Sequence, residues 1–253
     1  MDYTILADEI ASWMNEISHQ AGTEGFVIGL SGGIDSAVTG ALCKRAAKDA
    51  VLGVWMPCHS VAEDETFARM VAQKLEIEMI TVDLCAVYDA FLYALPRGNQ
   101  MARANLKPRL RMSTVYYLAQ ANGYLVAGTG NRPELQVGYF TKYGDGGVDL
   151  EPLGGLYKHE VRKLARVLGV PQPVIDRAPS PGLWPGQTDE GEMGITYAEI
   201  DAILAAWDAG QRPQLAEDRV AKVRRMVARS AHKRAMPPHF PMERFRIGQH
   251  ARG

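Results

Sequence analysis

The stretch Gly29-Leu30-Ser31-Gly32-Gly33-Ile34-Asp35-Ser36 decides the fold that we expect for this chain. An apolar run at residues 26–30 leads into it and a helical pattern at residues 36–48 leads out of it, which predicts a strand, a glycine turn and a helix. A Ser/Gly-rich turn at a helix N-terminus presents N–H groups and the positive end of the helix dipole to an anion. The stretch therefore predicts a phosphate-binding loop, and an ordinary serine-capped turn is its alternative.

This loop belongs to neither of two common phosphate-binding types. The chain has no Gly-Lys dipeptide, which excludes a Walker loop, and the stretch does not read G-x-G-x-x-G. Asp35 would repel a bound phosphate unless a cation lay between them. Mg²⁺, held by one or two carboxylates and by phosphate oxygens, resolves that conflict, so we expect a magnesium ligand at Asp35.

Short apolar runs alternate with helical patterns along much of the chain. Residues 51–56, 78–82 and 124–127 predict three further strands, apolar on successive residues as in a sheet covered on both faces. The capping box Ser60-Val61-Ala62-Glu63 predicts the start of a helix that ends near residue 75. Further helices are expected at residues 101–122, 161–168, 197–209 and 214–231. The alternation predicts an α/β fold with a parallel sheet.

Two stretches rich in glycine and proline, residues 138–155 and 171–194, are expected to contain no regular element. Both hold aromatic or charged residues that a plain linker does not need, such as Tyr139 and Trp184. Loops of this length in a compact domain are typically binding loops or lids. The tail at residues 237–253 has no clear pattern.

Composition limits the class of protein. With 253 residues, 47% of them hydrophobic, the chain can form a core without disulfides or a structural metal. The 28 Lys and Arg nearly balance the 29 Asp and Glu, for a net charge of −1, so we expect no nucleic-acid partner and no membrane partner. Three cysteines without a C-x-x-C pair indicate core thiols in a reducing cytoplasm. The uncharged residues 112–131 predict a helix end, a turn at Gly123 and a strand rather than a membrane span, because polar residues interrupt them.

The motif S-G-G-x-D-S after a strand resembles the loop of the ATP pyrophosphatase superfamily, whose members cleave ATP between its α and β phosphates and adenylate a substrate. Further segments, in their order and spacing, resemble the ammonia-dependent NAD synthetases over roughly residues 5–236. One of them is G-Y-F-T-K-Y-G-D-G-G-V-D at residues 138–149, whose first nine residues are the most specific. The others are K-P-R-L-R-M (107–112), G-T-G-N-R-P-E (128–134), L-Y-K (156–158), G-Q-T-D-E (186–190) and H-K-R (232–234).

The resemblance implies a role for each matching residue. Asp35 and Lys158 would act in catalysis, and Asp35 and Glu134 would bind Mg²⁺. The positions that would contact ATP are Gly29 to Ser36, Thr129, Lys158 and Ser180. The positions that would bind deamido-NAD are Arg109, Lys142, Asp149, His232 and Lys233.

The resemblance also implies a fold and a reaction. The fold is a Rossmann-like (adenine nucleotide alpha hydrolase-like) parallel sheet flanked by helices, in a single domain over residues 1–253 with no glutaminase domain. The reaction uses ATP to amidate the nicotinate carboxylate of deamido-NAD with ammonia, and gives NAD, AMP and pyrophosphate through an acyl adenylate. The family implies a homodimer in the cytoplasm.

Most of these positions can also be explained without a ligand. Lys158 is more informative, because a cation near the start of a helix opposes the helix dipole and needs another partner, which an ATP phosphate would supply. Ser180 is followed by Pro181-Gly182 where the family pattern has Ala-Asp, so its role is open. Without the resemblance, six residues would be interpreted as solvated charges or as charges at helix ends. They are Arg109, Arg111, Glu134, Lys142, Asp149 and His232.

Two other functions stay open at this point. Another ATP pyrophosphatase, such as the synthetase part of GMP synthetase or a tRNA-thiolating enzyme, shares the loop, although a thiolating enzyme would want paired cysteines and a basic face. A regulatory module that senses ATP without catalysis is disfavoured by the presence of both Asp35 and Glu134. Pyrophosphate release with deamido-NAD distinguishes these functions.

Overall fold

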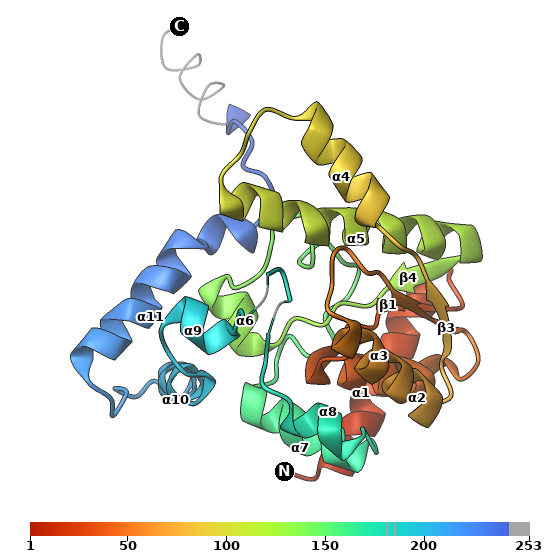
Figure 1. The fold of residues 1–253 in the computed structure, drawn as a ribbon. Coiled ribbons are helices and arrows are strands. Elements are labelled where there is room, and N and C mark those ends of the chain that lie inside the picture. Colours follow the sequence, from red (N-terminus) through yellow and green to blue (C-terminus); the bar gives the residue numbers. More distant parts are fainter. Residues whose placement is uncertain (181, 185, 243–253) are drawn as a thin grey trace, which may run out of the picture.

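The computed structural model describes residues 1–180, 182–184 and 186–242. In this part of the chain four parallel strands form one sheet, in the order β3-β2-β1-β4. Each lies within one residue of a predicted strand at either end, and helices cover both faces (Figure 1), which confirms the predicted α/β fold. The strands are β1 (Gly25–Gly29), β2 (Val51–Trp55), β3 (Glu78–Thr81) and β4 (Tyr124–Val126).

Alternate residues of β1 enter two separate cores. Phe26 and Ile28 pack on one face and Val27 packs on the other, and all three are fully buried. Both faces of β1 are thus covered, as a strand inside a parallel sheet requires. The first face is covered by α1 (Tyr3–Gln20), α2 (Ile34–Ala47), α3 (Ala62–Lys74), α7 (Lys158–Val167) and α8 (Gln172–Asp176), and the second by α4 (Cys85–Ala94) and α5 (Gln100–Asn122).

A third core lies beside the sheet, on the side away from β3 (Figure 1). Ile200, Ile203 and Val223 are fully buried in it. Because α6 begins soon after β4, this core is tied to the carboxyl end of the sheet. Its helices are α6 (Arg132–Val137), α9 (Asp189–Met193), α10 (Tyr197–Asp208) and α11 (Glu217–Arg229), and the short η1 (Ala231–Lys233) follows α11.

The predicted capping box at residues 60–63 is wrong. α3 begins at Ala62 with Val61 as its N-cap, and this cap makes no side-chain hydrogen bond. The Ser60 hydroxyl instead accepts hydrogen bonds from Cys58 N (3.3 Å) and from a guanidinium nitrogen of Arg111 (3.3 Å). The Ser60 hydroxyl thus accepts from the charged guanidinium of Arg111 and not from a backbone N–H group of α3, which a capping box requires.

Two further expectations are corrected. β3 is an edge strand with partly or fully exposed residues, so it is not covered on both faces. Residues 171–194 were expected to be irregular but contain α8 and α9. Pro173 lies in the first turn of α8, and Gly194 ends α9 with φ +62°, which are positions where proline and glycine do not break a helix.

The uncharged stretch at residues 112–131 divides as predicted. α5 ends at Asn122, Gly123 adopts φ +69° and β4 follows. Within the described ranges every helix is too short or too polar to span a bilayer. Residues 138–155 contain no helix or strand, as expected, and an isolated bridge joins Leu150 to Ala127.

The predicted burial of the cysteines holds for two of them. Cys43 and Cys58 are buried, whereas Cys85 is only partly buried. Of the tail without a clear pattern, residues 243–253 lie outside the described residues.

Candidate active site

A cavity of about 710 Å³ opens at the carboxyl ends of the strands, where ligands bind in parallel α/β sheets. Its wall combines the glycine loop after β1, the segment from β4 to α6, the loop at residues 138–148, the middle of α5 and the loop after α8. It brings together most residues that the sequence singles out. Those in the wall are Gly29, Leu30, Ser31, Gly33, Ile34, Asp35, Ser36, Arg109, Thr129, Glu134, Lys142, Ser180, His232 and Lys233.

Hydrogen bonds made by two serines connect the beginning and the end of the glycine loop. Ser36 Oγ donates to the Gly33 carbonyl (2.9 Å) and lies 3.1 Å from Ser31 Oγ. Gly32 has φ +77°, a left-handed conformation that glycine adopts without strain. α2 then begins at Ile34 with Gly33 as an N-cap that offers no side chain. The first turn of α2 is therefore left without a side-chain cap, which suits a bound phosphate.

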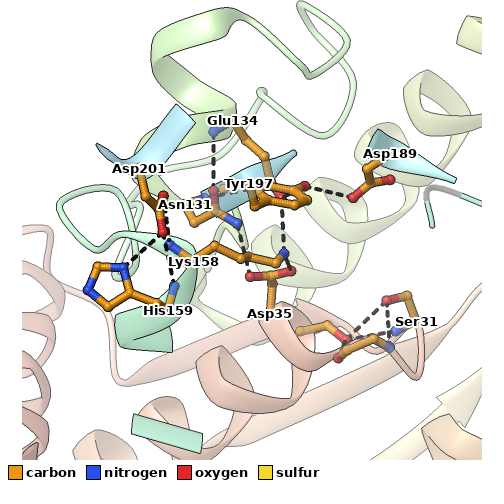
Figure 2. Close-up of polar contacts among 12 residues, drawn as sticks. Ser31, Asp35, Asn131, Glu134, Lys158, His159, Asp189, Tyr197 and Asp201 are labelled. Carbon is orange, nitrogen blue, oxygen red and sulfur yellow. Dashed lines mark hydrogen bonds and ion pairs between the residues drawn. The ribbon is translucent and has the colours of Figure 1, made fainter. Parts of the chain in front are cut away.

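Lys158 is the first residue of α7, and its side chain is 1% exposed. Its Nζ lies 2.5 Å from Asp35 Oδ2 and 3.3 Å from Glu134 Oε1 (Figure 2). Asn131 joins the same two acids, because its Nδ2 donates to Asp35 Oδ1 (3.0 Å) and its Oδ1 accepts from Glu134 N (3.1 Å). The partner that Lys158 needs is thus supplied by a pair of carboxylates.

Burial and charge act on this cluster in opposite directions. Burial alone would lower the pKa of Lys158, but the adjoining Asp35 and Glu134 outweigh it and raise that pKa, so the lysine stays charged. Burial raises the pKa of Glu134 to about 7, against the lowering effect of Lys158. The negative charge of Asp35 adds to the rise. A second cation near Glu134 would therefore favour its ionised form.

Tyr197 of α10 completes the cluster and is 2% exposed. Its ring centroid lies 4.6 Å from Lys158 Nζ, a cation–π contact. Its hydroxyl lies 2.7 Å from Glu134 Oε1 and 2.7 Å from Asp189 Oδ2. Asp189 Oδ1 is buried and has no hydrogen-bond partner among the described residues. Three carboxyl groups therefore lie near one lysine. When they are ionised, their combined negative charge exceeds the single positive charge of Lys158.

A divalent cation fits this donor set. Asp35 and Glu134 offer carboxylate oxygens, which Mg²⁺ prefers. In the described part of the chain no group of three or more His, Cys, Asp and Glu side chains is placed to hold a metal. Mg²⁺ typically takes one or two carboxylates and completes its shell with phosphate and water, so these residues suit a metal that arrives with ATP.

A second group of cations lines the same cavity. Lys233 Nζ donates to the Gly138 carbonyl (2.7 Å), and Lys142 Nζ donates to the His232 carbonyl (2.6 Å). Arg109 projects from α5, and its guanidinium lies 3.5 Å from the Lys142 carbonyl. These side chains contact backbone carbonyl oxygens, and they form a cationic wall that suits a pyrophosphate-bearing anion.

Asp149 is not among the described residues that line the cavity. Its Oδ1 accepts from the Tyr116 hydroxyl (3.0 Å) and its Oδ2 accepts from Val126 N (2.8 Å). Its carboxylate thus ties residues 138–155 to α5 and β4.

Ser180 lines the cavity, and its Oγ donates to the Gln187 carbonyl (2.7 Å). The hydroxyl therefore helps to close the loop between them. The departure from the family pattern begins at Pro181, which lies outside the described residues.

Several residues of the site are not among the functional residues predicted from the sequence. Asn131 had a local signal, because Asn131-x-x-Glu134 forms a capping box. Arg111 donates to the Met56 carbonyl (3.1 Å) and so braces the end of β2, although it reads as a surface charge. Asp189 lies in the G-Q-T-D-E segment, which indicated the family but not its contact with Tyr197. Tyr197 carries no signal of its own, because it reaches Glu134 only through the packing of α10.

A glycine loop after a parallel strand, an acid–lysine cluster beside it and a cavity with further cations define an α/β protein that binds nucleotide phosphates. The model of the NAD synthase family matches residues 6–237. A curated relative from Carboxydothermus hydrogenoformans, named NH(3)-dependent NAD(+) synthetase, is 48% identical over 235 residues, which are 91% of this chain and 94% of that protein.

Two solved structures are similar over nearly the whole chain. NMN synthetase from Francisella tularensis has a TM-score of 0.87 at 36% identity, covering 95% of this chain and 100% of that one. An NH3-dependent NAD synthetase from Campylobacter jejuni, in complex with the nitrate ion, has a TM-score of 0.83 at 29% identity with the same coverage. The chain belongs to the NAD synthase family.

Proposed function

We propose that this protein uses ATP to amidate the nicotinate carboxylate of deamido-NAD with ammonia, giving NAD, AMP and pyrophosphate. The observation that carries the proposal is one cavity that joins the phosphate loop, the acids Asp35 and Glu134, and the cations Arg109 and Lys142. ATP and a dinucleotide are both anionic, and the cavity offers groups suited to each. Membership of the NAD synthase family supports the same assignment.

ATP is proposed to bind with its phosphates on the loop from Ser31 to Ser36 and the first turn of α2. Thr129 and Ser180, which both line the cavity, are its further proposed contacts. Asp35 and Glu134 would hold Mg²⁺, which neutralises phosphate charge when it is bound.

Deamido-NAD is proposed to bind the cationic wall. Arg109, Lys142, His232 and Lys233 suit its pyrophosphate. Asp149 is kept as a proposed contact, with the spare acceptor capacity that its bonds to Tyr116 and Val126 leave. Since Asp149 lies off the cavity wall, it is the least supported member of the set.

The reaction needs no side-chain nucleophile. The nicotinate carboxylate attacks the α-phosphorus of ATP and pyrophosphate leaves; ammonia then attacks the carbonyl carbon of the acyl adenylate and AMP leaves. Lys158 is proposed to stabilise the charge that develops on the phosphates, because its buried ammonium is preorganised beside Asp35. The loop at residues 138–155 and the described parts of the segment between α8 and α9, residues 178–180, 182–184 and 186–188, are proposed as lids that protect the adenylate from water.

Pyrophosphate release tests the proposal. With Mg²⁺, ATP, deamido-NAD and ammonium, the protein should release one pyrophosphate for each NAD formed, and glutamine should not replace ammonium. Faster turnover of nicotinate mononucleotide than of deamido-NAD would replace the proposed substrate, an outcome suggested by the likeness to an NMN synthetase. ATP binding without pyrophosphate release under any of these conditions would favour a regulatory module.

Asp35→Asn isolates the proposed metal ligand. This variant should lose magnesium-dependent pyrophosphate release while it keeps the circular dichroism spectrum of the wild type. Asp49→Asn is the control, because that acid follows α2 and its side chain is 99% exposed. Wild-type turnover in Asp35→Asn would remove Asp35 from the mechanism.

We further propose a homodimer in the cytoplasm. Val87 and Phe91 of α4, and Leu95 directly after this helix, are 44%, 46% and 51% exposed, which supports an apolar contact between copies. The three free thiols suit a reducing compartment. Sedimentation should show a dimer for the wild type and a monomer for Phe91→Asp. A monomeric wild type would exclude this assembly.

A further inference from the structure

The first two N–H groups of α7 have their partner on another helix. A helix leaves its first N–H groups without intrahelical acceptors. Lys158 N donates to Asp201 Oδ1 (3.3 Å) and His159 N donates to Asp201 Oδ2 (3.2 Å). Asp201 belongs to α10 and is 5% exposed. It therefore caps α7 from outside, with a negative charge that offsets the unfavourable place of Lys158 at the positive end of the helix dipole.

α10 also holds the other end of the Lys158 side chain. Tyr197 precedes Asp201 by four residues, so both lie on one face of α10. The ring of Tyr197 contacts Lys158 Nζ and its hydroxyl bonds to Glu134 (Figure 2). The backbone nitrogen and the ammonium of Lys158 are thus both held by α10. A lysine held at both ends loses most of the freedom that it has on an exposed helix.

α10 is itself firmly placed. Ile200 and Ile203 anchor it in the third core. At its last residue, Asp208 forms an ion pair with Arg132, the first residue of α6. The helix that caps α7 is therefore tied to the helix that carries Glu134.

We propose that Asp201 is a positioning residue for the amidation reaction: through the N–H groups of Lys158 and His159 it keeps the Lys158 ammonium against Asp35 and Glu134. The inference rests on the proposed function. Without this acceptor two backbone N–H groups lose their partner, and so does His159 Nδ1, which lies 2.9 Å from Asp201 Oδ2. The first turn of α7 then frays, which displaces Lys158 without removing it. A small displacement of a charge-stabilising group slows turnover strongly, whereas substrate affinity rests on many other contacts.

Asp201→Asn tests the proposal, because it keeps the size of the side chain but turns one acceptor into an amide donor that faces an N–H group. We expect kcat to fall at least about tenfold, with KM for ATP and for deamido-NAD within about threefold of the wild type. Hydrogen exchange in a peptide covering residues 157–166 should become faster, which measures the cap without any activity assay. Asp201→Ser, with one hydroxyl acceptor, is the second variant if Asp201→Asn does not fold.

Thr196→Ala is the matched control. Thr196 caps α10 itself, and its side-chain bonds stay within residues 196–199. This variant should lower the melting temperature but leave kcat and the exchange at residues 157–166 near wild-type values. Wild-type kcat in the folded Asp201 variant, or an equal loss of kcat in Thr196→Ala, would overturn the proposal. A wild-type protein without amidation activity would instead refute the proposed function, while the exchange result would still report on the cap.

Discussion

Lys158 Nζ lies 2.5 Å from Asp35 Oδ2, in an ion pair whose lysine side chain is 1% exposed and whose acid side chain is 21% exposed. Asp35 is also the acid that we propose as a magnesium ligand. The lysine thus neutralises the same two acids, Asp35 and Glu134, that a bound metal would neutralise. Lys158 and the proposed metal would therefore compete for them.

Lys158→Met should make the ligand-free protein less stable and more responsive to magnesium. Removing one partner of a buried ion pair typically costs about 3–5 kcal/mol, because the other charge is left uncompensated. Asp35 and Glu134 would then be available to a metal, which stabilises the folded state by binding to it. Thermal unfolding with and without MgCl₂, in the absence of ATP, measures both effects.

The control for this variant is Lys163→Met, an exposed position on the same helix. It should keep the stability and the magnesium response of the wild type. The same magnesium-induced shift in melting temperature for Lys158→Met and the wild type would contradict a metal site at Asp35 and Glu134.

Gly32→Ala should damage the phosphate loop. Gly32 has φ +77°, and a Cβ placed there would lie 2.7 Å from the Asp64 carbonyl oxygen and 2.7 Å from Phe67 Cβ. The left-handed conformation alone costs about 1–2 kcal/mol for a residue with a side chain, and the clash with α3 adds to it. We expect a loss of more than about 2 kcal/mol in unfolding free energy and weaker ATP binding by calorimetry.

Gly123→Ala separates the two causes of that loss. Gly123 has φ +69°, but a Cβ there would meet nothing within 4 Å. It should therefore show only the cost of the backbone conformation, with unchanged ATP affinity. Equal effects of the two substitutions would show that the contact between the loop and α3 does not matter.

Arg109→Ala and Lys142→Ala should each raise KM for deamido-NAD far more than KM for ATP. Both residues belong to the cationic wall, at a distance along the chain from the glycine loop. Loss of one cation near a bound pyrophosphate weakens that ligand selectively. Arg103→Ala, an exposed position earlier on α5, is the control and should leave both constants unchanged. Equal increases for the two substrates would show that the subsites are misassigned.

Glu151→Gln should change how stability depends on pH. Burial raises the pKa of Glu151 from 4.5 to about 8, against a hydrogen bond from Gly130 N that lowers it. Between these values the folded carboxyl stays protonated while the unfolded one ionises, so the wild type loses stability as pH rises through this window. The amide of the variant stays neutral at every pH in this range, and its oxygen can still accept from Gly130 N.

Urea unfolding at several pH values checks this prediction. Near pH 5 the Glu151→Gln variant and the wild type should be similar, and near pH 8 the variant should be more stable by about 3 kcal/mol. Parallel pH profiles would show that Glu151 ionises normally in the folded protein.

Much of the fold could be predicted, because it rests on local patterns. The four strands and the turn at Gly123 follow from apolar runs and from a glycine between them. The short helices α8 and α9 were missed because proline and glycine occupy helix ends there. Two other failures depend on distant parts of the chain. Arg111 took the Ser60 hydroxyl that was expected to cap α3. The exposure of β3 follows from strand order, which no local pattern records.

The candidate site was predictable residue by residue but not as an arrangement. Asp35, Glu134 and Lys158 could be singled out by motif, yet their mutual contact could not, since residues 35 and 158 are brought together by the packing of α7 against α2. Asp149 matched a motif equally well and proved to lie off the cavity wall. A motif identifies residue types and their order along the chain. Whether a residue lines the cavity depends instead on where the fold places it in space.

By itself, the sequence determined the glycine loop between β1 and α2, since glycine freedom and the start of a helix are properties of neighbouring residues. Only the tertiary structure decided that Lys158 is neutralised by two carboxylates, capped by Asp201 and stacked on Tyr197. These partners come from three other helices, α2, α6 and α10. Their contact depends on how the buried faces of these helices pack. A buried charge needs a partner, and that partner can come from any part of the chain that packing brings close.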